Sequence, residues 1–122
     1  MEIHGHGKAV LDALNPEVRA LRQHIPEVFK GFAALAGAAM APGALDRKTK
    51  ELIALAIAVV EHCDGCIAAH AKGAAAAGAT EPEVAEAIGV TVLMHGGPGT
   101  VYGPRAFAAF QEYLAARRSP EA

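Results

Sequence analysis

The 122-residue sequence contains no tryptophan, and aromatic residues make up only 5 % of it. Hydrophobic residues nevertheless reach 52 %. Much of this share is alanine, which has the highest helix propensity but buries little apolar area. The composition therefore favours one domain of closely packed helices. Because burial contributes only about 25 cal/mol per Å² of apolar surface, we expect further copies of the chain to bury more surface in an obligate homo-oligomer.

Three further absences exclude whole classes of protein. The formal net charge of -2 shows no basic excess, so neither nucleic acid nor an anionic membrane is an expected partner. The longest apolar run covers residues 52–60, whereas a membrane-spanning helix needs about 20 residues. Residues 1–8 also lack the apolar segment of a signal peptide. We therefore expect a cytoplasmic protein.

The chain has only two cysteines, Cys63 and Cys66, which lie three residues apart. In a cytoplasmic protein such a pair more often serves redox chemistry or metal binding than a structural disulfide. A structural zinc site takes four ligands, but this motif offers three, with His70 as the third and Glu51, His62 or water as the only candidates for a fourth. Haem attachment is excluded because isoleucine, not histidine, follows the second cysteine. We expect no metal and no cofactor.

The patterning predicts an all-α fold of about six helices. Asn15 and Pro16 form a helix start, and Thr80 with Glu83 forms a capping box. We expect a flexible segment over residues 1–14, one all-α domain over 15–118 and a loose end over 119–122. The predicted helices cover residues 15–24, 26–40, 47–61, 63–77, 81–95 and 104–117.

Helical geometry groups the candidate functional residues. At about 100° per residue, Cys63, Cys66 and His70 lie on one helix face. Unpaired N–H groups at the helix start favour a thiolate on Cys63. We expect Cys66 to lie deeper, where it needs His70 as a base. If the preceding helix packs antiparallel, Glu51 reaches the depth of His70 and can orient its imidazole, and His62 is a possible auxiliary residue that tunes Cys63.

The spacing Glu51-x11-Cys63-x2-Cys66-x3-His70 resembles the active-site pattern of alkylhydroperoxidase D, in the carboxymuconolactone decarboxylase superfamily. The similarity extends over residues 27–115, through the segments 45–60 and 71–84 on either side of the motif. It implies a helical bundle of the alkylhydroperoxidase D type, assembled into trimers or hexamers.

The resemblance also implies an activity, the thiol-dependent reduction of hydroperoxides in antioxidant defence. An external dithiol reductant of lipoyl or thioredoxin type would restore the dithiol, and we expect it to attack Cys63 as the more exposed cysteine. Cys66 would attack the peroxide first and Cys63 would then form the disulfide, although the helix dipole alone favours Cys63 as nucleophile. One position departs from the pattern, because Gly65 stands where alkylhydroperoxidase D has a histidine, and His62 is the candidate substitute.

Two other classes of function stay open. A decarboxylase-like lyase would use Glu51 and His70 as acid and base without thiol chemistry, and would bind an anion through Arg47 or Arg105. A non-enzymatic oligomer would instead sense redox state or hold zinc.

Overall fold

The computed structural model describes residues 5–118, all of whose regular secondary structure is helical. The all-α fold and the number of helices predicted from the sequence are confirmed. The six helices are α1 (Lys8–His24), α2 (Pro26–Met40), α3 (Arg47–Val60), α4 (Asp64–Ala76), α5 (Glu81–His95) and α6 (Gly99–Arg118). None of them is both long and apolar enough to cross a membrane.

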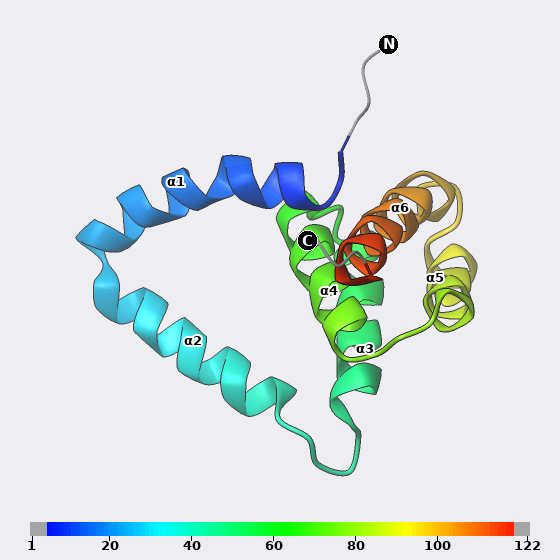
Figure 1. The fold of residues 1–122 in the computed structure, drawn as a ribbon, viewed down its shortest axis with the longest axis horizontal. Helices are drawn as coiled ribbons and strands as arrows, with labels where there is room; N and C mark the ends of the chain where they lie inside the picture. Colours follow the sequence, from blue (N-terminus) through cyan, green and yellow to red (C-terminus); the bar gives the residue numbers. More distant parts are fainter. Residues whose placement is uncertain (1–4, 119–122) are drawn as a thin grey trace.

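Helices α3–α6 form the body of the molecule (Figure 1). The buried core comes from these four helices and the α4–α5 loop, and α4 packs against both α3 and α6. Alanine side chains let the helices approach closely, as the composition predicts. The largest apolar side chains in the core are Phe110, Leu55, Ile67, Val59 and Val84.

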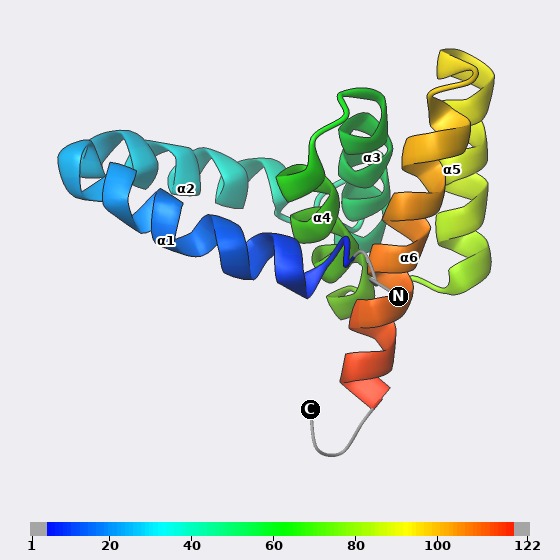
Figure 2. The same cartoon turned by 90° about the horizontal axis from the view of Figure 1, so that it is seen from above.

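Helices α1 and α2 form an arm that extends away from the body in both views (Figures 1 and 2). Neither helix buries a residue in the single chain. The C-terminal end of α2 is attached to the body through Lys50, which donates hydrogen bonds to the carbonyl oxygens of Ala39 and Ala41, at 3.0 and 2.6 Å. The arm therefore contributes surface rather than core.

Local capping signals explain where the body helices begin. The Asp46 carboxylate accepts a hydrogen bond from the N–H of Thr49 at 2.7 Å and caps α3. Thr80 and Glu83 form the reciprocal capping box of α5. Both starts agree with the helices predicted from the sequence.

The predicted start of α1 at Asn15 is wrong, because the helix begins at Lys8 and continues through Pro16. Proline removes one backbone hydrogen bond from a helix, but long-range contacts hold the turns before it. The N–H of Lys8 donates to Glu112 at 2.8 Å, and a β-carbon at Gly7 would lie 2.9 Å from the ring of Tyr113. Residues 8–14, expected to be flexible, are therefore helical.

The predicted start of the last helix at Pro104 is also wrong, because α6 begins at Gly99. Two glycines allow α6 to lie directly on α5. A β-carbon at Gly99 would lie 3.1 Å from the backbone of Thr91, and one at Gly103 would lie 2.7 Å from the side chain of Ile88. This close packing supports the first turn of α6 ahead of its proline. The loose end expected over residues 119–122 lies outside the described range.

Candidate active site

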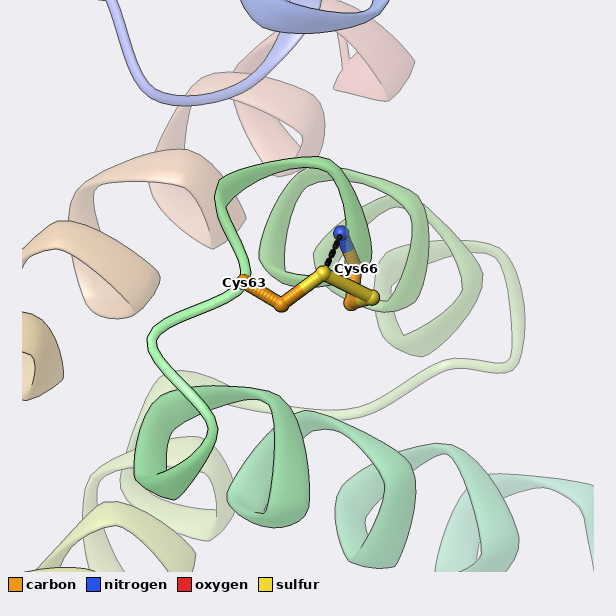
Figure 3. Close-up of a disulfide and its surroundings, with 2 residues drawn as sticks. All are labelled: Cys63 and Cys66. Carbon is orange, nitrogen blue, oxygen red and sulfur yellow. Dashed lines mark hydrogen bonds between the residues drawn. A yellow bond between two sulfur atoms is a disulfide. The ribbon is translucent and has the colours of Figure 1, made fainter.

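Cys63 and Cys66 form a disulfide at the start of α4, with their Cα atoms 5.2 Å apart (Figure 3). Cys63 is the N-cap of α4, and its Sγ accepts a hydrogen bond from the N–H of Cys66 at 3.3 Å. The positive end of the helix dipole favours negative charge at this position. In the reduced protein, Cys63 is therefore the cysteine whose thiolate the helix stabilises.

Cys66 is exposed and Cys63 is half-buried, so the prediction that Cys66 lies deeper is wrong. Helix α4 turns its opposite face to the core, and that face carries the buried Ile67, Ala68 and Ala71. On the face shared by Cys66 and His70, Cys66 is exposed and His70 is half-buried. Cys66 is thus the more exposed of the two cysteine residues.

Glu51 and His70 form the second pair of the site. Glu51 is buried, with 2 % of its surface exposed. Its Oε1 lies 3.2 Å from Nδ1 of His70. A carboxylate can only accept a hydrogen bond, so Nδ1 of His70 is the donor to Glu51, and this contact selects the tautomer in which Nε2 is the acceptor of the ring. The antiparallel packing of α3 and α4 predicted from the sequence brings these two residues together.

The two pairs share one face of α4. Cys66 and His70 are four residues apart on the same helix, a spacing at which side chains are neighbours. The imidazole is one-third exposed, so it is open to a ligand at the surface where Cys66 lies. An accessible sulfur, a histidine base and a buried carboxylate can together carry out proton-coupled thiol chemistry.

A cavity of about 400 Å³ lies beside the Glu51–His70 pair, between α2, α3 and α4. Two cationic residues line it, Arg47 and Lys72. The Nε atom of Arg47 lies 4.0 Å from Glu51. The sequence predicted Arg47 as a candidate anion-binding residue, and this cavity contains it. Lys72 was not predicted, because only its positive charge and its position two residues after His70 distinguish it in the sequence.

Arg105, the other predicted anion-binding candidate, belongs to a different cluster. Its guanidinium carbon lies 4.7 Å from the ring centre of Tyr102. The imidazole of His62 stacks on the same ring, with centroids 4.2 Å apart, and its Nε2 lies 3.0 Å from Nε2 of His95. The side chain of His62 is thus engaged with α5 and α6, although its backbone immediately precedes Cys63. The sequence offered no signal for this contact, since 33 residues separate the two histidines.

Gly65, between the two cysteines, packs against the arm. A β-carbon at this position would lie 3.1 Å from Cδ2 of Leu14 in α1. A side chain at position 65 would therefore meet a leucine of the N-terminal helix.

Metal binding was one alternative for the cysteine motif. Within residues 5–118, no group of three or more histidine, cysteine, aspartate or glutamate side chains is arranged to hold a metal ion.

Comparison with known proteins places the site in a family context. The model of the carboxymuconolactone decarboxylase family matches residues 26–112. An uncharacterized protein of Cupriavidus necator is 37 % identical over 84 % of this chain and 91 % of its own length. An uncharacterized protein of the cox locus of Paracoccus denitrificans is 43 % identical over 66 % of this chain and 73 % of its own length.

Solved structures share the same fold. An apo carboxymuconolactone decarboxylase family protein from Legionella pneumophila is 42 % identical, with a TM-score of 0.81 over 84 % of this chain and 92 % of its own. A protein from Thermotoga maritima is 28 % identical, with a TM-score of 0.78 over 91 % of this chain and 97 % of its own. The similarity in both comparisons extends across nearly the whole chain.

Proposed function

Because the chain belongs to the carboxymuconolactone decarboxylase family, we propose that it is a thiol-dependent peroxidase that reduces hydroperoxides with its Cys63–Cys66 dithiol in antioxidant defence. One observation carries the proposal. The buried Glu51 holds His70 at 3.2 Å, on the helix face that also carries Cys66. A lyase has no need of a dithiol beside its acid–base pair, whereas a thiol peroxidase needs both.

The reaction takes place in two steps. His70 accepts the proton of Cys66, and the thiolate attacks the terminal peroxide oxygen. The S–O bond forms, the O–O bond breaks, and the alcohol leaves with the proton that His70 returns. Cys63 then attacks the sulfenic acid, so that the disulfide forms and hydroxide leaves as water with the Cys63 proton. Two electrons have passed from the dithiol to the peroxide.

An external dithiol, of lipoyl or thioredoxin type, returns these electrons. The exposure of Cys66 makes it the sulfur that the reductant attacks. Cys63 then leaves as the thiolate that the N-terminus of α4 stabilises. Attack at Cys63 was expected from the sequence, and the observed exposures favour the opposite choice.

The exposed apolar stripe of the arm supports assembly into a homo-oligomer, a trimer or hexamer. Val28, Phe32 and Leu35 of α2 are 63 %, 66 % and 64 % exposed. Their spacing places them along one helix face. A second copy of the chain would cover this face and supply the burial that the arm lacks.

The cavity beside Glu51 supports one competing function, a decarboxylase-like lyase. Such an enzyme would bind an acidic substrate through Arg47 and use Glu51 and His70 without the cysteines. Replacement of both cysteines by serine would leave a lyase fully active, whereas it abolishes peroxidase activity.

Thiol counting after reaction with hydroperoxide tests the proposal. The reduced protein is treated with one equivalent of cumene hydroperoxide, and metal content is measured on the same sample. We expect two thiols per chain to be lost within seconds, and an added dithiol to restore them. Thiols that survive the peroxide would rule out the peroxidase, and bound zinc would point to the metal-holding alternative.

A further inference from the structure

We infer that the cavity beside Glu51 and His70 binds the carboxylate end of an acidic hydroperoxide, in which about 9 Å separates the carboxylate from the peroxide group. The inference rests on the proposed peroxidase function and names its substrate class. It depends on three properties of the cavity: its apolar walls, its charge and its distance from Cys66.

The walls of the cavity suit an apolar chain. The cavity has a volume of about 400 Å³ and lies between the arm and the body. Apart from its charged residues and His70, small or apolar side chains line it. These are Ala36, Gly37, Met40, Ala69, Gly73 and Ala76.

The charges of the cavity favour an anion. Arg47 and Lys72 contribute two positive charges, against one negative charge on Glu51. Glu51 already has two partners, His70 at 3.2 Å and Nε of Arg47 at 4.0 Å. Among the described residues, Lys72 has no carboxylate partner within 4.0 Å. A ligand carboxylate at this end of the cavity would pair with Lys72 and with the terminal nitrogens of Arg47.

The position of Lys72 along α4 sets the length of the ligand. The α-carbons of Cys66 and Lys72 are six residues apart, which corresponds to a rise of about 9 Å along the axis of a helix at about 1.5 Å per residue. Ala69 and His70 line the cavity between these levels, on the face that carries Cys66. An extended chain advances about 3.5 Å per three bonds, so roughly eight bonds join the two ends of the ligand.

This length describes a specific class of hydroperoxide. In an unsaturated C18 fatty acid that is peroxidised at carbon 9, eight bonds separate the carboxyl carbon from the carbon that bears the peroxide. The 13-hydroperoxide of the same acid places the two groups too far apart, and a methyl ester lacks the charge. These three molecules form a matched set of probes.

Single-turnover oxidation of the thiols tests the inference. The reduced protein is mixed with the 9-hydroperoxide of linoleic acid, with its methyl ester or with the 13-hydroperoxide, each below its micelle concentration. We expect the 9-hydroperoxy acid to react at least tenfold faster than the ester and several-fold faster than the 13-isomer. Arg47→Gln and Lys72→Gln should bring the acid-to-ester ratio close to one. Arg117→Gln and Lys30→Gln, matched changes outside the cavity, should leave that ratio as it is in the wild type.

A second measurement separates this inference from the peroxidase proposal. The second measurement is calorimetry of the disulfide form with nonanoate, which has the same length but no peroxide group. We expect nonanoate to bind and methyl nonanoate not to bind. Lys72→Gln should weaken the binding of nonanoate at least tenfold. Equal rates for acid and ester would overturn the inference and leave the peroxidase proposal standing. If no hydroperoxide reacted, the peroxidase proposal would fail, and nonanoate binding that is insensitive to Lys72 would overturn the cavity assignment as well.

Discussion

The carboxylate of Glu51 lies directly against the backbone of Gly73, in the space that a β-carbon on Gly73 would fill. Only glycine leaves room there for a side chain from α3. Glu51 is buried and fixes the imidazole of His70. The glycine at position 73 therefore makes the geometry of the acid–base pair possible.

Gly73→Ala should therefore displace Glu51 and destabilise the protein by about 1–3 kcal/mol, the usual cost of overpacking a buried site. Gly89→Ala on α5 is the control, because nothing lies within 4 Å of a β-carbon there. A Gly→Ala change at an open helix position stabilises by about 0.5–1 kcal/mol. Urea unfolding measures both variants. Equal stability of the two would contradict the packing described for Glu51.

The acid–base pair should act as a unit in peroxide reduction. His70→Gln should slow the oxidation of the thiols by about 100-fold, the typical contribution of a general base. Glu51→Gln keeps an oxygen near Nδ1 but removes the charge, so its effect should be smaller. The double variant should be no slower than His70→Gln alone. Stopped-flow kinetics with cumene hydroperoxide gives all three rates, and losses that simply multiply would show that the two residues act independently.

The order of the two cysteines can be read by trapping the sulfenic acid. Cys66 is the exposed cysteine and stands four residues from His70, so Cys63→Ser should accumulate a sulfenic acid on Cys66 that dimedone labels. Cys66→Ser should react slowly and give little adduct. Mass spectrometry locates the label. An adduct on Cys63 in Cys66→Ser, formed at the wild-type rate, would reverse the assignment.

The arm should carry the contacts of the proposed homo-oligomer. Phe32→Glu places a charge in the middle of the exposed stripe of α2, and we expect it to yield monomers in sedimentation velocity at micromolar concentration. Its helix content should stay unchanged, because Phe32 is 66 % exposed in the single chain. Lys30→Glu, on the opposite side of the same helix, should sediment like the wild type. A wild-type protein that is itself monomeric would remove the basis for assembly through the arm.

The capping box of α5 should make stability depend on pH. The ammonium group of Lys48, with the N–H of Thr80 next, lowers the pKa of Glu83 below its ordinary value of 4.5. A carboxyl group with a lower pKa in the folded state stabilises the fold above its unfolded pKa, and this contribution is lost as the pH falls through the folded pKa. Glu83→Gln should therefore be less stable than the wild type at pH 7, and the two should converge below pH 4.5. Thermal unfolding of both proteins across this pH range measures the difference in their stability. A difference that stays constant down to pH 3 would exclude a role for the charge of Glu83.

Much of the body of the fold could be predicted from the sequence because its signals are local. Thr80 and Glu83 mark the start of α5 by themselves, and the spacing from Cys63 to His70 follows from helix geometry. The meeting of Glu51 and His70 required only that two consecutive helices pack antiparallel across a short turn.

The features that the sequence did not predict depend on contacts distant in the chain. In the sequence, Pro16 is typical of a helix start. The helix begins earlier because the N–H of Lys8 donates a hydrogen bond to Glu112, 104 residues away. The exposure of Cys66 depends on which face of α4 packs against the core. Because alanines occur on several faces of that helix, the sequence pattern does not identify the buried face. The pairing of His62 with His95 depends on the register between α5 and the turn before α4.

The contact between Leu14 and Gly65 gives the arm a direct connection to the cysteine motif. Coupling free energies are reciprocal. If assembly changes the free energy of reducing the disulfide, then reduction changes the free energy of assembly by the same amount. If the proposed assembly through the arm exists and prefers one redox form, the reduction potential of the cysteines and the concentration at which the subunits associate are coupled quantities, and each should be measured with the other held fixed.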